Sequence, residues 1–330
     1  MSPEIRGIHH YTYCVGPAQE DVDFHTGTLG LRLLKQTGLF EGTKPIYHLY
    51  YGNAEGDAGT ILTSFPVRQQ GYTGHLGTNQ ISRLNLSIPR DAVGFWMDRL
   101  RERGLDPETV ELYGTERVHF AHPSGVPYGL VADGFGDPAR AWEQGGVGAD
   151  QAILGNHGVT VNVSDPEAMV TYLETGMGAV ADGADGTSAS RRWRVGADPH
   201  RVGFIELVED PDSEPGTQTL GEGTVHHCAW DVADAEVQTE IKERVDSLGF
   251  DGEWIGPRDR VYFVSLYNRT PGGALFEYAW SKPGLWTVNE PADELGQTFQ
   301  VPPTFVDQAD TILDHLEPLN VPSPAAHRGP

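Results

Sequence analysis

The sequence predicts an α+β fold made of four similar βαβββ units, and two periodic features support this prediction. Helical patterns of apolar residues recur at 89–103, 164–175 and 233–248, with a weaker one at 20–30. A glycine follows each pattern at nearly equal spacing, as expected where a helix ends in a left-handed residue. These glycines are Gly30, Gly104, Gly178 and Gly249. Such internal repetition indicates one supersecondary unit used four times.

A strand-like stretch precedes each of these helices. The four stretches read HHYTYCV, SRLNLSI, NHGVTVNV and HHCAWDV, and each alternates between apolar and polar residues over part of its length. Apolar residues recur at helical spacing in the segments that follow, for example Val237, Ile241 and Val245. In SDPEAM, Ser164 or Asp165 is suited to a helix N-cap. Each helix is followed by β-rich stretches such as RVYFVSLYN and ALFEYAW.

The four units are expected to form two tandem domains. The segment GDPARAWEQGGVGADQA, rich in glycine, alanine and charge, has the composition of a linker between two pairs of units. We therefore expect a first domain at 1–140, a linker at 141–152 and a second domain at 153–283. Residues 284–330 form a Pro-rich arm with one short helix. Each domain should be a partly open, barrel-like mixed sheet with its helices outside.

An excess of acidic residues is the most unusual feature of the composition. The chain has 47 Asp and Glu against 23 Lys and Arg, a formal net charge of −24. This excludes a typical nucleic-acid-binding protein, because binding to phosphates needs positive charge. An acidic surface is typical of a salt-rich, halophilic cytoplasm, where ions screen the repulsion between like charges.

The sequence also lacks the signals of a membrane or secreted protein. No stretch approaches the roughly 20 apolar residues of a membrane span, and MSPEIRGIHH has no apolar signal-peptide core. The two cysteines, Cys14 and Cys228, are too few for a disulfide framework, so we expect buried thiols. These observations favour a soluble cytoplasmic protein, with a homo-oligomer as one option.

A repeated histidine doublet is the main functional signal. His9 and His10 begin the first strand, and His226 and His227 begin the equivalent strand of the last unit. Neighbouring side chains in a strand point to opposite faces, so one histidine of each doublet should face a shared site. We expect His10 and His227 to be metal ligands. The third unit has Gly158 at the same place and offers no ligand.

A carboxylate completes a plausible ligand set. Glu277 lies in the apolar strand ALFEYAW, where a charge is unfavourable unless it is paired with an arginine or binds a cation. Two imidazoles and one carboxylate are the set that holds non-haem Fe(II) in oxygenases. Glu206 occupies the position equivalent to Glu277 in the third unit and is a rival ligand. Most remaining histidines, including His25, His48 and His122, should be surface, capping or hydrogen-bonding groups.

These residues resemble the vicinal oxygen chelate superfamily, which comprises glyoxalases and extradiol dioxygenases, and within it the hydroquinone and chlorohydroquinone ring-cleaving type. The resemblance covers roughly residues 7–305. Its most specific parts are GIHHYTYCVGPAQEDVDF, PIYHLYYGNAEGDAGTILTSFP, HHCAW and DRVYFVSLYNRTPGGALFE. It implies a facial triad of His10, His227 and Glu277, favouring His10 over Glu206.

The resemblance also implies the groups around the metal: His9, Thr12, His226, Arg260 and Tyr267. Thr12, Arg260 and Tyr267 would bind the substrate, and His9 or His226 would act as acid or base. Because His9 and His226 alternate away from the ligands, they need a local bend to reach the edge of the pocket, or must reach it across the interface between units. Arg260 could instead pair with Asp259 or Asp251, and Tyr267 could be an ordinary strand aromatic.

The function implied is an Fe(II)-dependent dioxygenase that opens a hydroquinone-like ring, halogenated or not, with O2; Mn(II) is the alternative metal. The partners are therefore a small aromatic substrate and dioxygen, without nucleic acid or membrane. One alternative is a glyoxalase-type lyase or isomerase, whose sites usually carry a fourth protein ligand. Another is a protein that binds an aromatic compound or antibiotic without chemistry, although binding alone needs no His, His, Glu set.

Overall fold

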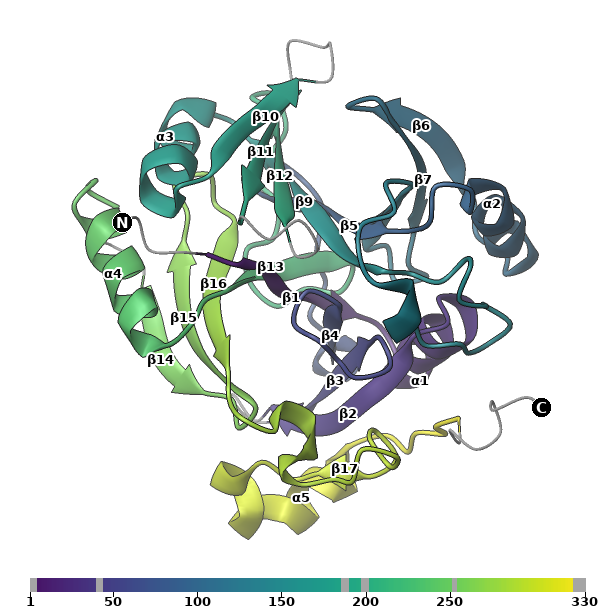
Figure 1. Cartoon of the computed structure of the whole chain (residues 1–330). Coiled ribbons are helices and arrows are strands. Elements are labelled where there is room, and N and C mark those ends of the chain that lie inside the picture. The colour runs from purple at the N-terminus through teal and green to yellow at the C-terminus, as the bar shows by residue number, and fades with distance from the viewer. Residues whose placement is uncertain (1–4, 40–43, 185–189, 197–201, 251–253, 323–330) are drawn as a thin grey trace.

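The computed structural model describes residues 5–39, 44–184, 190–196, 202–250 and 254–322 (Figure 1). Unit one comprises β1 (Gly7–Val15), α1 (Ala18–Val22), the π-helical turn η1 (Asp23–Thr28), β2 (Arg32–Leu39), β3 (Ile46–Gly52) and β4 (Ile61–Pro66). Unit two comprises β5 (Gln80–Ser87), α2 (Val93–Glu102), β6 (Glu108–Leu112), β7 (Thr115–Ala121) and β8 (Pro127–Val131).

Units three and four repeat the same order of elements. Unit three comprises β9 (Gly155–Val163), α3 (Pro166–Thr171), the π-helical turn η4 (Tyr172–Met177), β10 (Val180–Ala184), β11 (Ser190–Val195) and β12 (Gly203–Glu209). Unit four comprises β13 (Thr224–Asp231), α4 (Ala235–Asp246), β14 (Trp254–Asp259), β15 (Phe263–Arg269) and β16 (Leu275–Ser281). The predicted α+β class and the fourfold βαβββ repeat are confirmed.

The strands form two mixed sheets, and each half of the chain contributes one unit to each sheet. Units four and one form a nine-stranded sheet in the order β14-β15-β16-β13-β1-β4-β3-β2-β17, and units three and two an eight-stranded sheet in the order β10-β11-β12-β9-β5-β8-β7-β6. The first strands of two units are antiparallel neighbours at the centre of each sheet. The helices lie outside the sheets (Figure 1). The domain boundaries proposed from the sequence stay a prediction.

The helices end where the glycine spacing predicts. Gly30, Gly104, Gly178 and Gly249 have φ of 73°, 79°, 72° and 83°, in the left-handed region that glycine adopts without strain. The N-cap of α3 is Asp165, whose side chain accepts a hydrogen bond from the backbone N–H of Glu167. None of the described helices is long and apolar enough to cross a membrane.

The C-terminal arm packs against unit one. It contains η5 (Leu285–Val288), β17 (Phe299–Gln300), η6 (Pro303–Gln308) and the predicted short helix, α5 (Ala309–His315). Strand β17 extends the larger sheet by pairing with β2. The buried indole of Trp286 donates to the carbonyl of Gly56 at 2.8 Å, and the buried ammonium of Lys35 pairs with Glu290. The arm thereby lies against β2 and β3 at the edge of the larger sheet (Figure 1).

The two sheets are joined through Tyr11 and share one apolar core. The Tyr11 hydroxyl, on β1, donates to the carbonyl of Gly158, on β9, at 2.7 Å. Gly158 is required at this place, because a Cβ there would lie 2.5 Å from the carbonyl oxygen of Phe204. The residue that replaces a ligand histidine in unit three is therefore fixed by close packing against β12 within its own sheet.

A buried ion pair lies on the smaller sheet. Arg117, on β7, and Glu206, on β12, are both buried, with 2.7 Å between Nη2 and Oε1. Burial alone raises the pKa of Glu206, but the charge and hydrogen bond of Arg117, together with His157 and Thr160, hold this pKa below its ordinary value. Glu206 therefore has a structural partner within its own sheet.

Removing one member of this pair should destabilise the fold more than removing both. We expect Glu206→Gln to lower the free energy of unfolding by about 3–5 kcal/mol, because Arg117 keeps a buried charge without a counterion. Replacing both residues with methionine should cost less than either single change. Urea denaturation of the single and double variants measures this. Additive losses in the double variant would contradict the assignment.

Candidate metal centre

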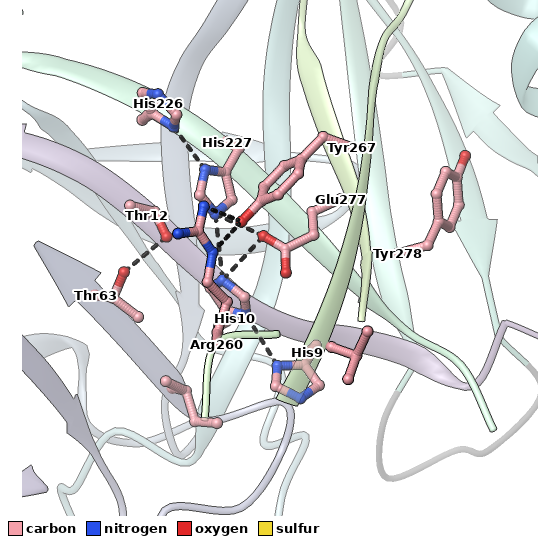
Figure 2. Close-up of polar contacts among 12 residues, drawn as sticks. His9, His10, Thr12, Thr63, His226, His227, Arg260, Tyr267, Glu277 and Tyr278 are labelled. Atoms are coloured by element: carbon pink, nitrogen blue, oxygen red, sulfur yellow. Dashed lines mark hydrogen bonds and ion pairs between the residues drawn. The ribbon is translucent and has the colours of Figure 1, made fainter. Parts of the chain in front are cut away.

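The three predicted ligands converge at the junction of units one and four. His10 lies on β1, His227 on β13 and Glu277 on β16, and all three are buried (Figure 2). The Nε2 atoms of His10 and His227 are 3.2 Å apart. Oε2 of Glu277 lies 3.5 Å from Nε2 of His10 and 2.9 Å from Nε2 of His227. Three ligand atoms so close together can share one cation.

Strand register explains this convergence. Thr12 is directly opposite His227 in the β1–β13 pair, so His10, two residues before Thr12, points to the same face as His227. In the parallel β13–β16 pair, Glu277 is aligned with Ala229, two residues after His227. Because every second side chain of a strand points to the same face, all three side chains lie on one face of the larger sheet.

The first histidine of each doublet reaches the same side through a β-bulge. The β1–β13 register shifts between Ile8 and His10 and again between Thr12 and Tyr13, which leaves His9 and His226 as the extra residues. The Nδ1 atoms of His9 and His10 are 2.9 Å apart, and those of His226 and His227 are 2.6 Å apart. Each presumed ligand is thus held through Nδ1, which leaves its Nε2 for a cation.

The carboxylate of Glu277 has the properties expected of a ligand. It is fully buried, and the polar contacts that it makes to described residues are those to the Nε2 atoms of His10 and His227. Burial alone raises its pKa, but His10 and His227 lower it well below the ordinary value. A buried carboxylate beside two imidazoles needs a positive partner, and a divalent cation fits this donor set.

Arg260 and Tyr267 lie beside this cluster. Tyr267 is the direct cross-strand partner of Glu277, and its ring packs edge-on against His227. The Nε and Nη2 groups of Arg260 donate to the Tyr267 hydroxyl at 3.3 and 3.2 Å. Burial and the charge of Glu277 raise the pKa of Tyr267, so the phenol stays protonated. Asp259 pairs with Lys282 at 2.6 Å, and Asp251 lies outside the described residues.

A pocket of about 260 Å³ opens onto the cluster. Three of the predicted groups, His226, Arg260 and Tyr267, line it together with the presumed ligands His10 and His227. Its apolar wall includes Leu39, Phe65, Leu220, Phe263 and Leu275. Thr12 and His9 are buried and do not line it; the Thr12 hydroxyl is instead 2.7 Å from that of Thr63. The pocket combines aromatic and apolar walls with a few polar groups, as small-molecule sites do.

His48 also lines this pocket, a position that the sequence analysis did not single out. Its Nε2 is 3.1 Å from the Thr63 hydroxyl and its Nδ1 is 3.0 Å from that of Tyr50. A signal was available in PIYHLYYG, because Tyr50 is the unit-one counterpart of Tyr267. Tyr50 is the cross-strand partner of Thr63, and Tyr267 is the cross-strand partner of Glu277. Thr63 and Glu277 occupy equivalent positions in their units.

A second buried group of Asp21, His25 and His122 has metal-like spacing but a different role. The backbone N–H of Ser124 donates to Nδ1 of His122 at 2.9 Å, so Nε2 carries the proton and cannot bind a cation. Asp21 accepts hydrogen bonds from the hydroxyls of Tyr51 and Ser64. This group is a hydrogen-bond network, as expected for His25 and His122 from the sequence.

The rival ligand Glu206 is in the other sheet, paired with Arg117. It does not join the cluster of His10, His227 and Glu277. The alternative set of His227, Glu277 and Glu206 is therefore not assembled in the described structure.

Comparison with known proteins finds relatives of this chain, although no protein-family model matches it. The chain is 35% identical over 315 residues to the chlorohydroquinone/hydroquinone 1,2-dioxygenase of Sphingobium indicum, covering 95% of this chain and 96% of the relative. It is 35% identical over 326 residues to MhqO of Bacillus subtilis, named as a ring-cleaving dioxygenase, covering 97% and 99%.

Solved structures give the same family and a wider fold relationship. The crystal structure of a Bacillus subtilis protein described as a dioxygenase superposes with a TM-score of 0.87 at 34% identity, covering 97% of this chain and 99% of that one. Glyoxalase I from Zea mays superposes with a TM-score of 0.61 at 15% identity over 83% of this chain and 92% of that one, which shows the fold alone. The chain belongs to the family of ring-cleaving dioxygenases that these relatives represent, and it shares its fold with glyoxalase I.

Proposed function

We propose that the chain is an Fe(II)-dependent dioxygenase that opens a hydroquinone-like ring, with or without halogen substituents, beside a hydroxylated carbon. The observation that carries this proposal is the buried cluster of His10, His227 and Glu277 beneath an aromatic-walled pocket. The 35% identical relative named chlorohydroquinone/hydroquinone 1,2-dioxygenase supports the substrate class. His10, His227 and Glu277 would hold the metal, and Fe(II) supplies the redox chemistry between dioxygen and the ring.

Arg260 and Tyr267 would bind the substrate oxygen. Both line the pocket, and the positive charge of Arg260 favours a substrate bound as phenolate. Because Arg260 donates to the Tyr267 oxygen, the Tyr267 hydrogen is left to donate to an oxygen of the substrate.

His226 is better placed than His9 to move a proton. His226 lines the pocket, and its Nε2 has no hydrogen-bond partner among the described residues. His9 is fully buried and its Nε2 is 2.9 Å from the hydroxyl of Ser281. We assign the acid–base role to His226, and to His9 the role of orienting His10 through Nδ1.

The geometry favours the dioxygenase over a glyoxalase-type lyase or isomerase. In the described part of the chain, three ligand groups converge rather than four. Three protein ligands leave positions for both an aromatic oxygen and dioxygen. A protein that only binds aromatic compounds would have no need of a buried carboxylate between two imidazoles.

Metal analysis and oxygen uptake test the function directly. We expect the purified protein to contain iron and to consume oxygen with hydroquinone or chlorohydroquinone, faster than with catechol or gentisate. Chelation should abolish uptake, and Fe(II) should restore it better than Mn(II). An active preparation without iron, or uptake with none of these compounds, would count against the proposal.

Replacement of Glu277 tests the metal site against a matched control. Glu277→Gln should lose iron and activity, because a neutral amide is a much poorer ligand. Glu206→Gln changes the equivalent residue of the other sheet and should keep iron, although it lowers stability. Metal content per chain, measured on folded protein, distinguishes the two. Iron retained in Glu277→Gln would refute the assigned site.

Two histidine variants separate the roles of the doublets. His9→Gln should weaken iron affinity by about 10–100-fold, because His10 loses its supporting imidazole. Once saturated with Fe(II), it should have nearly normal kcat. His226→Gln should lower kcat by about 100-fold relative to the unchanged protein even when it is saturated with iron, because the proton acceptor is gone. Iron titration followed by oxygen uptake measures both, and equal kcat in the two saturated variants would contradict the assignment.

A further inference from the structure

The pocket above the ligand cluster receives polar groups from one side of the larger sheet and apolar groups from the other. The ligand strands β16, β13 and β1 lie between β14 and β15 on one side and β4, β3 and β2 on the other (Figure 1). Tyr267 lies on β15 and Arg260 directly follows β14. Leu39, at the end of β2, and Phe65, on β4, line the pocket from the second side. A ring held by its oxygen at Arg260 and Tyr267 therefore directs its other edge toward these apolar side chains.

Leu39, Phe65 and Leu220 form one continuous apolar surface, which we call the far wall. Leu220 lies in the connection between β12 and β13 and packs against the hydrophobic cluster that contains Leu39 and Phe65. All three line the pocket. Phe65 is two residues after Thr63, which is aligned with Thr12, so it points to the face of the sheet that carries the presumed ligands. The far wall and the ligand cluster therefore border the same pocket from the same face.

The polar side chains beside the far wall are engaged elsewhere. Both ring nitrogens of His48 are already hydrogen-bonded to hydroxyl groups, at 3.1 and 3.0 Å. The side-chain amide of Gln218 donates to the carbonyl of Asn79 at 3.0 Å. Thr219 is exposed, so water can serve its hydroxyl. A polar group placed against the far wall would lose its hydration without gaining a partner, which is unfavourable.

The connection that carries Leu220 is anchored on both sides of this residue. Before it, the backbone N–H of Thr217 donates to the carbonyl of His75 at 3.0 Å. After it, Glu222 accepts hydrogen bonds from Arg68 with both of its carboxylate oxygens. Leu220 is thereby held in a defined place. A surface organised in advance in this way can select a bound group by its size and shape.

The pocket is small, so contacts with the far wall have a large effect on what fits. Its volume of about 260 Å³ is below the roughly 300–1,000 Å³ of sites for drug-sized ligands. It therefore suits a single ring with small substituents. The ring of Phe65 packs edge-on against that of His226, with centroids 5.7 Å apart. A substituent on the far wall consequently also affects where the ring lies relative to His226.

We propose that Leu39, Phe65 and Leu220 form a subsite for one small apolar substituent of the ring, a halogen atom or a methyl group. The preferred substrates are then halogen- or methyl-substituted hydroquinones. The inference rests on the proposed function, because Arg260 and Tyr267 are taken to hold the ring oxygen. A halogen or methyl group gains free energy when it leaves water for these side chains. The carboxylate of gentisate would be desolvated there without a partner.

Replacing Leu220 tests the subsite, because this residue is half-buried in a connection outside the two sheets. In the unchanged protein, we expect kcat/KM for chlorohydroquinone and for methylhydroquinone to exceed that for hydroquinone by about 10-fold. Leu220→Ala should lower both ratios at least about 3-fold, because a cavity replaces the contact, with iron content retained. Oxygen uptake gives the ratios. Dissociation constants measured without dioxygen should change in the same direction.

A polar variant and a matched leucine complete the test. Leu220→Asn keeps the approximate size of the side chain but not its apolar surface, so it should lower both ratios further than Leu220→Ala does. Leu275 lines the pocket from β16, on the side of β14 and β15. Leu275→Ala should lower kcat/KM for all three compounds by a similar factor, which leaves the ratios as they are.

The outcomes for the subsite and for the enzyme can be told apart. Ratios near one in the unchanged protein would overturn the subsite while leaving the dioxygenase intact. So would ratios that stay the same in Leu220→Ala and Leu220→Asn, or that fall as much in Leu275→Ala as in Leu220→Ala. Unchanged protein that consumes no oxygen with any of the three compounds would overturn the proposed function and the subsite together.

Discussion

The two single-residue bulges in the β1–β13 pair are the constraint on which the site depends. Strict alternation in a strand would send His9 and His226 to the face opposite His10 and His227. The bulges turn each neighbour back, so that two imidazoles support the Nδ1 atoms of two others. The same shifts recur in the β5–β9 pair, where Ser82 and His157 are the extra residues. The bulge is therefore a property of the unit, and the residues placed on it determine its chemistry.

Four equivalent positions illustrate how the repeated unit has diverged. Strand pairing aligns Thr63, Gly129, Glu206 and Glu277 with the first strand of their own units. Glu277 faces two imidazoles, whereas Glu206 faces a buried arginine. At Gly129 a Cβ would lie 2.4 Å from Oδ1 of Asn85, so a side chain there would require Asn85 to move. One geometric position therefore serves as a presumed ligand, as part of an ion pair, as packing and as a hydrogen-bonded hydroxyl.

Much of the fold could be predicted from the sequence, because helix-ending glycines and alternating strands are local signals. The convergence of His10, His227 and Glu277 was expected from the repeated doublet, from a charge in an apolar strand and from the family resemblance, although their roles stay predictions. The pairing of units across the two halves could not be predicted, since strand partners are set by packing between distant segments. The contribution of His48 was missed although Tyr50, two residues further along the strand, is the counterpart of Tyr267. A histidine beside tyrosines does not by itself distinguish a pocket wall from a surface.

The pairing of β1 with β13 also determines when in the life of the chain the site can exist. The two histidines of the cluster are 217 residues apart. During synthesis the first strand leaves the ribosome long before its neighbour, and such distant contacts form slowly. Mutual repulsion from the acidic composition helps to keep these unfinished chains from associating. Any cation that this cluster holds can therefore be acquired only at the end of maturation, after translation of the last unit.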